Sequence, residues 1–256
     1  MNPHSRHSSP LVVAVLSLAL AAGLGLAKPA GAAKYDITIP GTTAYLQGQF
    51  HDLSEQIGLA IAYRPLAPAE PLGLLGFDVG VEITAVKIDK NESFWTAVNP
   101  DLPSYLGFPK LHAQKGLPFG LDVGLVYTKL PASNIGMFGG ELKWAILKGT
   151  LATPALALRG SYTTLTGVET LNVSTYGADV SISKGVGPIT PYAGIGEVWI
   201  NSSTNVAPLS VALADEAISA TRAFVGAKLS LLLLSFAAEV DFSKVPSYSF
   251  RAGLSF

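Results

Sequence analysis

PSYSFRAGLSF, residues 246–256, ends the chain on a strict alternation of side chains. Tyr248, Phe250, Ala252, Leu254 and Phe256 share one face of an extended chain, and Ser249, Arg251, Gly253 and Ser255 share the other. A period of two is the repeat of a β-strand with one apolar and one polar face. The sequence therefore predicts a strand that ends on an aromatic residue.

Nine earlier runs show the same period, at residues 55–64, 77–84, 119–128, 138–146, 156–164, 176–183, 189–200, 221–229 and 234–242. Each run has about the length of a tilted transmembrane strand, roughly 9 to 11 residues. The run at 189–200 is the weakest, and there Glu197 indicates that Tyr192, Val198 and Ile200 face outward. An even number of strands returns both ends of a barrel to the same side.

Thirteen charged side chains lie opposite the apolar face of these runs. A Lys or Arg on a lipid-facing surface near the bilayer midplane costs about 2–4 kcal/mol, so a membrane barrel turns such residues inward. The predicted lumen-facing residues are Asp78, Glu82, Asp122, Glu141, Lys143, Arg159, Asp179, Glu197, Arg222, Lys228, Glu239, Asp241 and Arg251. A soluble β-sandwich gives the same alternation with its apolar face inward, so the pattern alone leaves both folds open.

The amino terminus has the pattern of a secretory signal peptide over residues 1–33. Arg6 precedes an apolar run at 11–27, and the small residues at 30–33 offer an A-x-A cleavage site. An uncleaved anchor is the alternative, because the apolar run is close to the roughly 20 residues of a membrane span. No later apolar stretch is long enough for a transmembrane helix.

The signal, the alternating runs and the closing strand together resemble small bacterial outer-membrane β-barrel proteins. This resemblance implies a location in the cell outer membrane of a Gram-negative bacterium, with outer-membrane lipid and the barrel assembly machinery as partners. It also implies that Tyr248, Phe250, Leu254 and Phe256 form the assembly signal. Aromatic residues near the ends of many runs favour the barrel over the sandwich.

We therefore expect an all-β fold, a ten-stranded antiparallel transmembrane β-barrel of up-and-down topology. It occupies residues 54–256, after the signal peptide at 1–33 and a periplasmic segment at 34–53. The links expected to face outside are 65–74, 130–134, 165–171, 201–219 and 243–247. The long link at 88–116 is expected on the periplasmic side, with a helical turn that Asn91 caps and that carries Phe94, Trp95 and Val98.

Composition excludes several kinds of site. The chain has no Cys, so it forms neither a disulfide nor a thiolate metal site. Its net charge is −1 without a run of Lys or Arg, which gives no electrostatic footprint for nucleic acid. The predicted mature chain has only His51 and His112. They are not clustered, and neither lies on a predicted strand or outer loop, so we expect no metal, no cofactor and no catalytic residue.

Ten strands lie near the narrow end of the range of barrels. Eight strands enclose packed side chains or one small ligand, whereas 16 or more leave an aqueous channel. The sequence favours a non-enzymatic, porin-like membrane protein that is a narrow conduit or pocket for an unidentified small solute, or a structural component. Surface interaction through the outer loops is the alternative. An outer-membrane hydrolase is the weaker one, since such an enzyme needs an imidazole near its partner.

Overall fold

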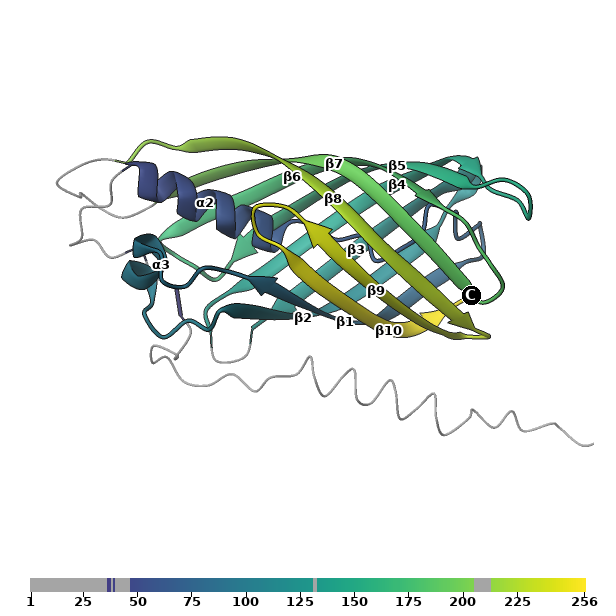
Figure 1. Ribbon diagram of the computed structural model, residues 1–256, viewed down its shortest axis with the longest axis horizontal. Helices are drawn as coiled ribbons and strands as arrows, with labels where there is room; N and C mark the ends of the chain where they lie inside the picture. The colour runs from purple at the N-terminus through teal and green to yellow at the C-terminus, as the bar shows by residue number, and fades with distance from the viewer. Residues whose placement is uncertain (1–35, 38, 40–46, 131–132, 205–212) are drawn as a thin grey trace, which may run out of the picture. The chain divides into compact units, whose positions relative to one another are not determined.

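The structure is a computed structural model that describes residues 36, 37, 39, 47–130, 133–204 and 213–256. The predicted signal peptide at 1–33 lies outside these residues. In the described part, ten antiparallel strands form a closed barrel in sequence order (Figure 1). The predicted fold class, a ten-stranded up-and-down β-barrel, is confirmed.

The strands are β1 (Phe77–Lys87), β2 (Tyr105–Gly116), β3 (Leu121–Lys129), β4 (Gly136–Lys148), β5 (Ala155–Thr166), β6 (Leu171–Ser183), β7 (Ile189–Thr204), β8 (Glu216–Leu231), β9 (Leu234–Phe242) and β10 (Ser247–Ser255). A 15-residue helix, α2 (Gln47–Ile61), precedes them. A short helix, α3 (Ser93–Val98), follows β1, and a single 3-10 turn, η1 (Pro118–Gly120), precedes β3.

The last residue of the chain closes the barrel against the first strand. β10 pairs with β1 from Val86↔Ser247 to Asp78↔Ser255. Beyond that register, Phe77 and Phe256 exchange backbone hydrogen bonds of 2.9 and 3.0 Å. Their rings meet edge to face with centroids 4.0 Å apart. A closed sheet leaves no unpaired strand edge, and the terminal aromatic pair lies at the seam.

The prediction of a first strand at residues 55–64 is wrong. Residues 47–61 form helix α2, with Phe50, Leu53, Ile57 and Ile61 buried. These positions follow the three- and four-residue spacing of a helix face. Within residues 55–64 alone, the apolar residues also fit a period of two. Phe50 and Leu53 resolve this ambiguity, because they continue the helical spacing before residue 55.

The missing strand lies in the predicted long link at 88–116. That stretch holds the expected helical turn, α3, followed by β2. Glu92 precedes the first turn of α3 without a side-chain capping bond, so the predicted cap at Asn91 is wrong. Strand β2 escaped prediction because its outward face carries Gly107, Pro109 and Ala113, whereas Leu106 and Phe108 point inward.

Antiparallel pairing gives the barrel two distinct ends. The links β1–β2, β3–β4, β5–β6, β7–β8 and β9–β10 lie at one end, which we call the loop end. Phe256 and the links β2–β3, β4–β5, β6–β7 and β8–β9 lie at the other, the terminal end. Two predicted placements are wrong as a result. The link that contains α3 shares an end with the β3–β4 link, and residues 65–72 lie inside the barrel.

The outer face of the barrel is apolar and carries aromatic residues on many strands. Side chains about half exposed to the surroundings include Ile83, Leu125, Leu142, Ile195, Val225 and Phe250. Exposed aromatic side chains occupy neighbouring strands in register, as at Tyr127↔Phe138 and Tyr176↔Trp199. An apolar outer band with aromatic residues is the surface of a barrel that faces lipid. Among the described helices, none has the length and hydropathy needed to cross a membrane.

Candidate functional site in the barrel lumen

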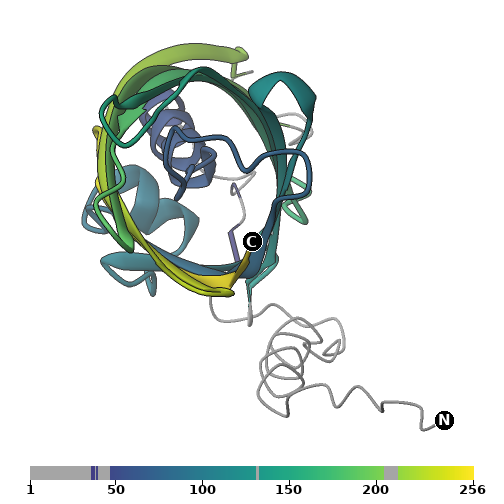
Figure 2. The same ribbon diagram turned by 90° about the vertical axis from the view of Figure 1, so that its right-hand side faces the viewer.

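The lumen contains a part of the chain itself. We call residues 47–72, which comprise α2 and the irregular stretch after it, the lumen segment. Figure 2, which looks along the barrel from the terminal end, shows α2 inside the ring of strands. Within the segment, Phe50, Leu53 and Leu66 are completely buried. The interior of the described barrel is therefore occupied by protein along much of its length.

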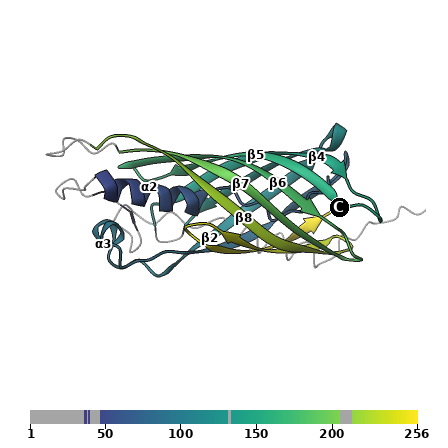
Figure 3. The same ribbon diagram turned by 45° about the horizontal axis from the view of Figure 1, so that its top comes forward.

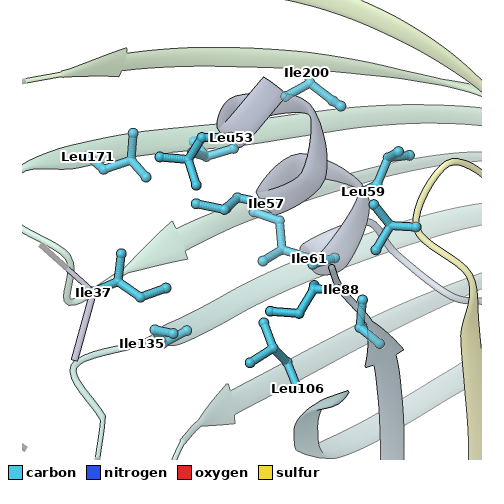
Figure 4. Packing of buried hydrophobic residues seen from close by; sticks show 14 of the residues in the cluster. Ile37, Leu53, Ile57, Leu59, Ile61, Ile88, Leu106, Ile135, Leu171 and Ile200 are labelled. Atoms are coloured by element: carbon cyan, nitrogen blue, oxygen red, sulfur yellow. The ribbon is translucent and has the colours of Figure 1, made fainter. Parts of the chain in front are cut away.

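The half of the lumen near the loop end is an apolar core. The buried apolar side chains of α2 pack against barrel-wall residues that include Leu106, Leu171 and Ile200, as Figure 4 shows. Trp95 of α3 belongs to the same cluster and donates an indole hydrogen bond of 2.8 Å to Gln56 of α2. Figure 3 shows α2 and α3 next to each other at this end. Burial of apolar side chains is the main stabilising contribution to such a core.

Gly58 lets α2 lie directly against strand β7. A Cβ atom at this position would come within 2.4 Å of the Ile200 side chain. Close by, Ser54 donates a 2.9 Å hydrogen bond to Ser202, and both serines are buried. A helix that approaches a strand so closely requires small residues at the contact.

Arg64 lies just after helix α2 and binds the backbone at the end of the helix. Its guanidinium donates to the carbonyl oxygens of Leu59, Ala60 and Ala62 at 2.8–3.0 Å, and also to the hydroxyl of Ser247 on β10 at 2.7 Å. The last carbonyls of a helix lack intrahelical donors and attract a positive charge. Arg64 therefore satisfies the helix end and ties it to the wall.

The irregular part of the lumen segment has a proline at every third position, Pro65, Pro68 and Pro71. The residue after each proline donates its backbone N–H to the wall. Leu66 donates to Glu239 at 3.0 Å, Ala69 to Ser183 at 2.9 Å and Leu72 to Asp122 at 3.1 Å. Because proline has no N–H, this spacing leaves fewer buried donors to satisfy. The three acceptors lie on β9, β6 and β3, so the segment contacts separate parts of the wall.

The remaining half of the lumen is charged. Buried carboxylates among the described residues are Asp78, Glu82, Asp122, Glu141, Asp179, Glu239 and Asp241. Buried Lys and Arg side chains are equal in number, namely Arg64, Lys110, Lys143, Arg159, Arg222, Lys228 and Arg251. Buried charges are tolerated where opposite charges pair with them. The balanced numbers make such pairing possible throughout the interior.

Twelve of the thirteen residues that the sequence placed in the lumen are buried inside the barrel. Glu197 is the exception, and its predicted placement is wrong. It points outward on β7 and accepts a 3.0 Å hydrogen bond from Thr221 on the neighbouring strand. Tyr192, Val198 and Ile200, predicted to face outward, are buried inside. The apolar loop-end core explains the error at Val198 and Ile200, which belong to its cluster and face the helix, whereas Tyr192 lies nearer the terminal end, against Phe224.

Five charges of alternating sign cross the wall from β4 to β9. Arg159 lies 2.8 Å from Glu141 and 3.6 Å from Asp179, at ion-pair distance but without well-aligned hydrogen bonds. Arg222 lies 3.6 Å from Asp179 and 3.4 Å from Asp241. Each arginine therefore lies between two carboxylates, and removal of either would leave two buried negative charges facing each other.

A second group is centred on two carboxylates of strand β1, Asp78 and Glu82. Glu82 pairs with Lys110 at 2.5 Å and with His112 at 3.2 Å. Asp78 pairs with Lys228 at 2.7 Å and with Arg251 at 3.3 Å. The sequence missed Lys110 and His112 because it missed β2. The signal that identifies them is Lys110, His112 and Gln114 at alternate positions, a polar inner face.

Lys143 connects the charged wall to the lumen segment. Its amine pairs with Asp122 at 2.9 Å and donates to the carbonyl oxygens of Pro68 and Glu70 at 3.0 and 2.9 Å. A pocket of about 210 Å³ lies beside it, lined in part by Leu72, Gln114 and Lys228. A larger hollow of about 520 Å³ lies on the outer face, where Gly160 and Ala178 are flanked by Trp144 and Leu158.

The two histidines occupy different environments, because His51 is exposed and His112 is buried. His112 is buried on β2, near Tyr63 and Arg251 as well as Glu82. His51 lies on α2 at the loop end, where Nδ1 is 2.7 Å from Glu216. Nearby, Lys244 pairs with Glu55 and Asp52 of the helix, and the hydrogen bond to Glu55 raises the pKa of the Lys244 amine. Over the described residues, no three His, Asp or Glu side chains are grouped as ligands for a metal ion.

Comparisons with known proteins find similarity at the level of structure. No family model and no curated protein matches the chain. Two of the solved structures that match are those of Ail, the attachment invasion locus protein of Yersinia pestis, and of Neisserial surface protein A. Both are small outer-membrane β-barrel proteins, the class that the closing strand resembles.

The similarity is distant in both cases. The Ail structure, solved with the heparin analogue sucrose octasulfate, is 13% identical, with 71% of this chain and 97% of Ail covered at a TM-score of 0.27. Neisserial surface protein A is 10% identical, with 70% of this chain and 95% of that protein covered at a TM-score of 0.30. At these values the matches say nothing about what this chain binds or does.

Proposed function

We propose that the protein is a non-enzymatic β-barrel of the Gram-negative outer membrane whose lumen is closed by its own lumen segment. Its role is then that of a structural membrane component, which holds the surface formed by α2, α3 and the loop-end links. The occupied lumen carries this proposal. Three backbone donors and Arg64 bind the segment to the wall, and the apolar core holds its helix.

The membrane location rests on the outer face. Its apolar and aromatic side chains would be costly in water, whereas lipid accommodates them. The buried charges rest inside, away from that lipid. Together with the predicted signal peptide and the terminal Phe256, these features support the outer membrane, with Phe256 on the periplasmic side and the loop end at the cell surface.

The closed lumen distinguishes this proposal from a conduit. We expect the folded full chain to give no steady single-channel current in planar bilayers. Folding is checked on a detergent gel, where a closed barrel migrates differently before and after boiling. An open porin in the same bilayer serves as the positive control. Reproducible steps of steady conductance from the folded protein would contradict a closed lumen.

A further inference from the structure

The lumen segment begins at the loop end. Gln47 donates to the Ala214 carbonyl at 3.1 Å, just before β8, and His51 contacts Glu216 at the start of that strand. Gln49 donates to Ser93 at the start of α3, at 2.8 Å. These partners lie at the beginning of β8 and in the β1–β2 link, both of which belong to the loop end.

Described residues upstream of the helix lie at the same end. Ile37 exchanges hydrogen bonds of 2.9 and 2.8 Å with the Asn134 side chain in the β3–β4 link. Ile39 donates to Thr170 in the β5–β6 link at 3.1 Å, and Asn99 donates to the Asp36 carbonyl at 3.0 Å. Three separate loop-end links therefore bind Asp36, Ile37 and Ile39.

The lumen segment ends at the opposite end of the barrel. Leu72 binds Asp122 near the start of β3, and Lys115 donates to the Leu74 carbonyl at 2.6 Å. Gly116, the last residue of β2, donates to Gly76 at 3.0 Å. Phe77 then starts β1 beside Phe256. Between residues 47 and 76 the chain therefore runs through the barrel from the loop end to the terminal end.

We infer that residues 47–76 cross the membrane once through the lumen, in addition to the ten strands, and so place the start of α2 and residues 36, 37 and 39 at the cell surface. This inference rests on the proposed function for the surface location. It reverses the expectation of a periplasmic segment at 34–53. The start of α2 and Phe256 then lie on opposite sides of the membrane, with Phe256 in the periplasm.

The contacts that fix the path make this crossing part of the folded state. Withdrawal of the segment would remove the backbone N–H groups that donate to Glu239 and Asp122. It would also remove the carbonyl oxygens that accept hydrogen bonds from Lys143. Each of these charged groups is buried in the folded state, and a buried polar group that loses a hydrogen-bond partner costs free energy.

Cysteine labelling in intact cells tests the surface location, since the chain has no native Cys. Gly48→Cys places a thiol at an exposed position of α2, where a Cβ meets no atom within 4 Å. Lys90→Cys marks the loop end, and Leu151→Cys, fully exposed in the β4–β5 link, marks the terminal end. We expect an impermeant maleimide to label the first two in intact cells, and Leu151→Cys only after permeabilisation.

Cross-linking in the purified protein tests the path independently of the membrane. A short bismaleimide should join the double variant Gln49→Cys/Ser93→Cys and should not join Gln49→Cys/Leu151→Cys. The reverse result, or labelling of Gly48→Cys only together with Leu151→Cys, would overturn the inference. If the cross-link forms as expected but Lys90→Cys and Leu151→Cys label alike in intact cells, the proposed membrane orientation fails, and the surface display fails with it.

Discussion

Replacement of Arg159 with Met is expected to lower the free energy of unfolding by about 3–5 kcal/mol, the usual cost of removing one partner from a buried ion pair. Arg159 is buried between Glu141 and Asp179. Without the guanidinium, the two carboxylates face each other across the interior with less compensation. Denaturant unfolding of the protein refolded in lipid vesicles measures the change.

Glu197→Gln is the matched control for Arg159→Met. Glu197 is on the outer face, and its contact with Thr221 is a hydrogen bond that an amide oxygen preserves. Because the substitution keeps this hydrogen bond and removes a charge from the lipid-facing surface, we expect no comparable loss of stability. Equal losses for the two variants would show that Arg159 is not buried in the charge network.

Replacement of Trp95 with Ala is the second large effect, with an expected loss of about 3–5 kcal/mol for a large aromatic residue removed from a core. Trp95 is 1% exposed and joins α3 to α2 through its ring and its bond to Gln56. The substitution leaves a cavity in the loop-end core and removes the donor to Gln56. The same unfolding measurement, with proteolysis of the β1–β2 link as a second readout, detects both consequences.

The chain supplies two controls of the same residue type. Trp144 and Trp199 are 48% and 45% exposed on the outer face. Their replacement by Ala leaves no enclosed cavity, because lipid fills the space, so we expect a clearly smaller loss from each. If Trp95→Ala were no more costly than Trp199→Ala, the account of a packed core between α2, α3 and the wall would be wrong.

The sequence predicts strands well where the outer face is apolar for contact with lipid and the inner face is polar. β1, β3, β9 and β10 have apolar residues outside and charges inside, and each was predicted near its observed place. The lumen segment changes this rule locally. Where α2 fills the lumen, the wall must be apolar on its inner face too, so Leu106 and Phe108 obscure β2 and Val198 and Ile200 reverse the reading of β7. Single-strand alternation cannot anticipate a helix inside the barrel.

The prediction of the candidate site from the sequence has the same limits. The alternation of side chains along each strand is sufficient to place twelve charged residues in the lumen. Which charges pair with each other depends on the register between strands and on the length of the side chains. Arg64 was missed because its stretch was read as a strand, although a basic residue after a helix is typical of a helix end. The three-residue spacing of Pro65, Pro68 and Pro71 is the clearest signal that an irregular segment with few backbone N–H donors follows α2.

Disulfide formation between Ser54→Cys and Ser202→Cys tests the occupied lumen most directly. The two hydroxyl oxygens are 2.9 Å apart, one on α2 and one on β7, and no native Cys competes. A disulfide requires about 3.5–4.5 Å between the Cβ atoms, which neighbouring serines in contact approach. The control pair is Ser54→Cys/Ser235→Cys, with Ser235 also buried but at the terminal end. We expect rapid oxidation of the first pair alone. Absence of that disulfide, or its formation in both pairs alike, would contradict the placement of α2 inside the barrel.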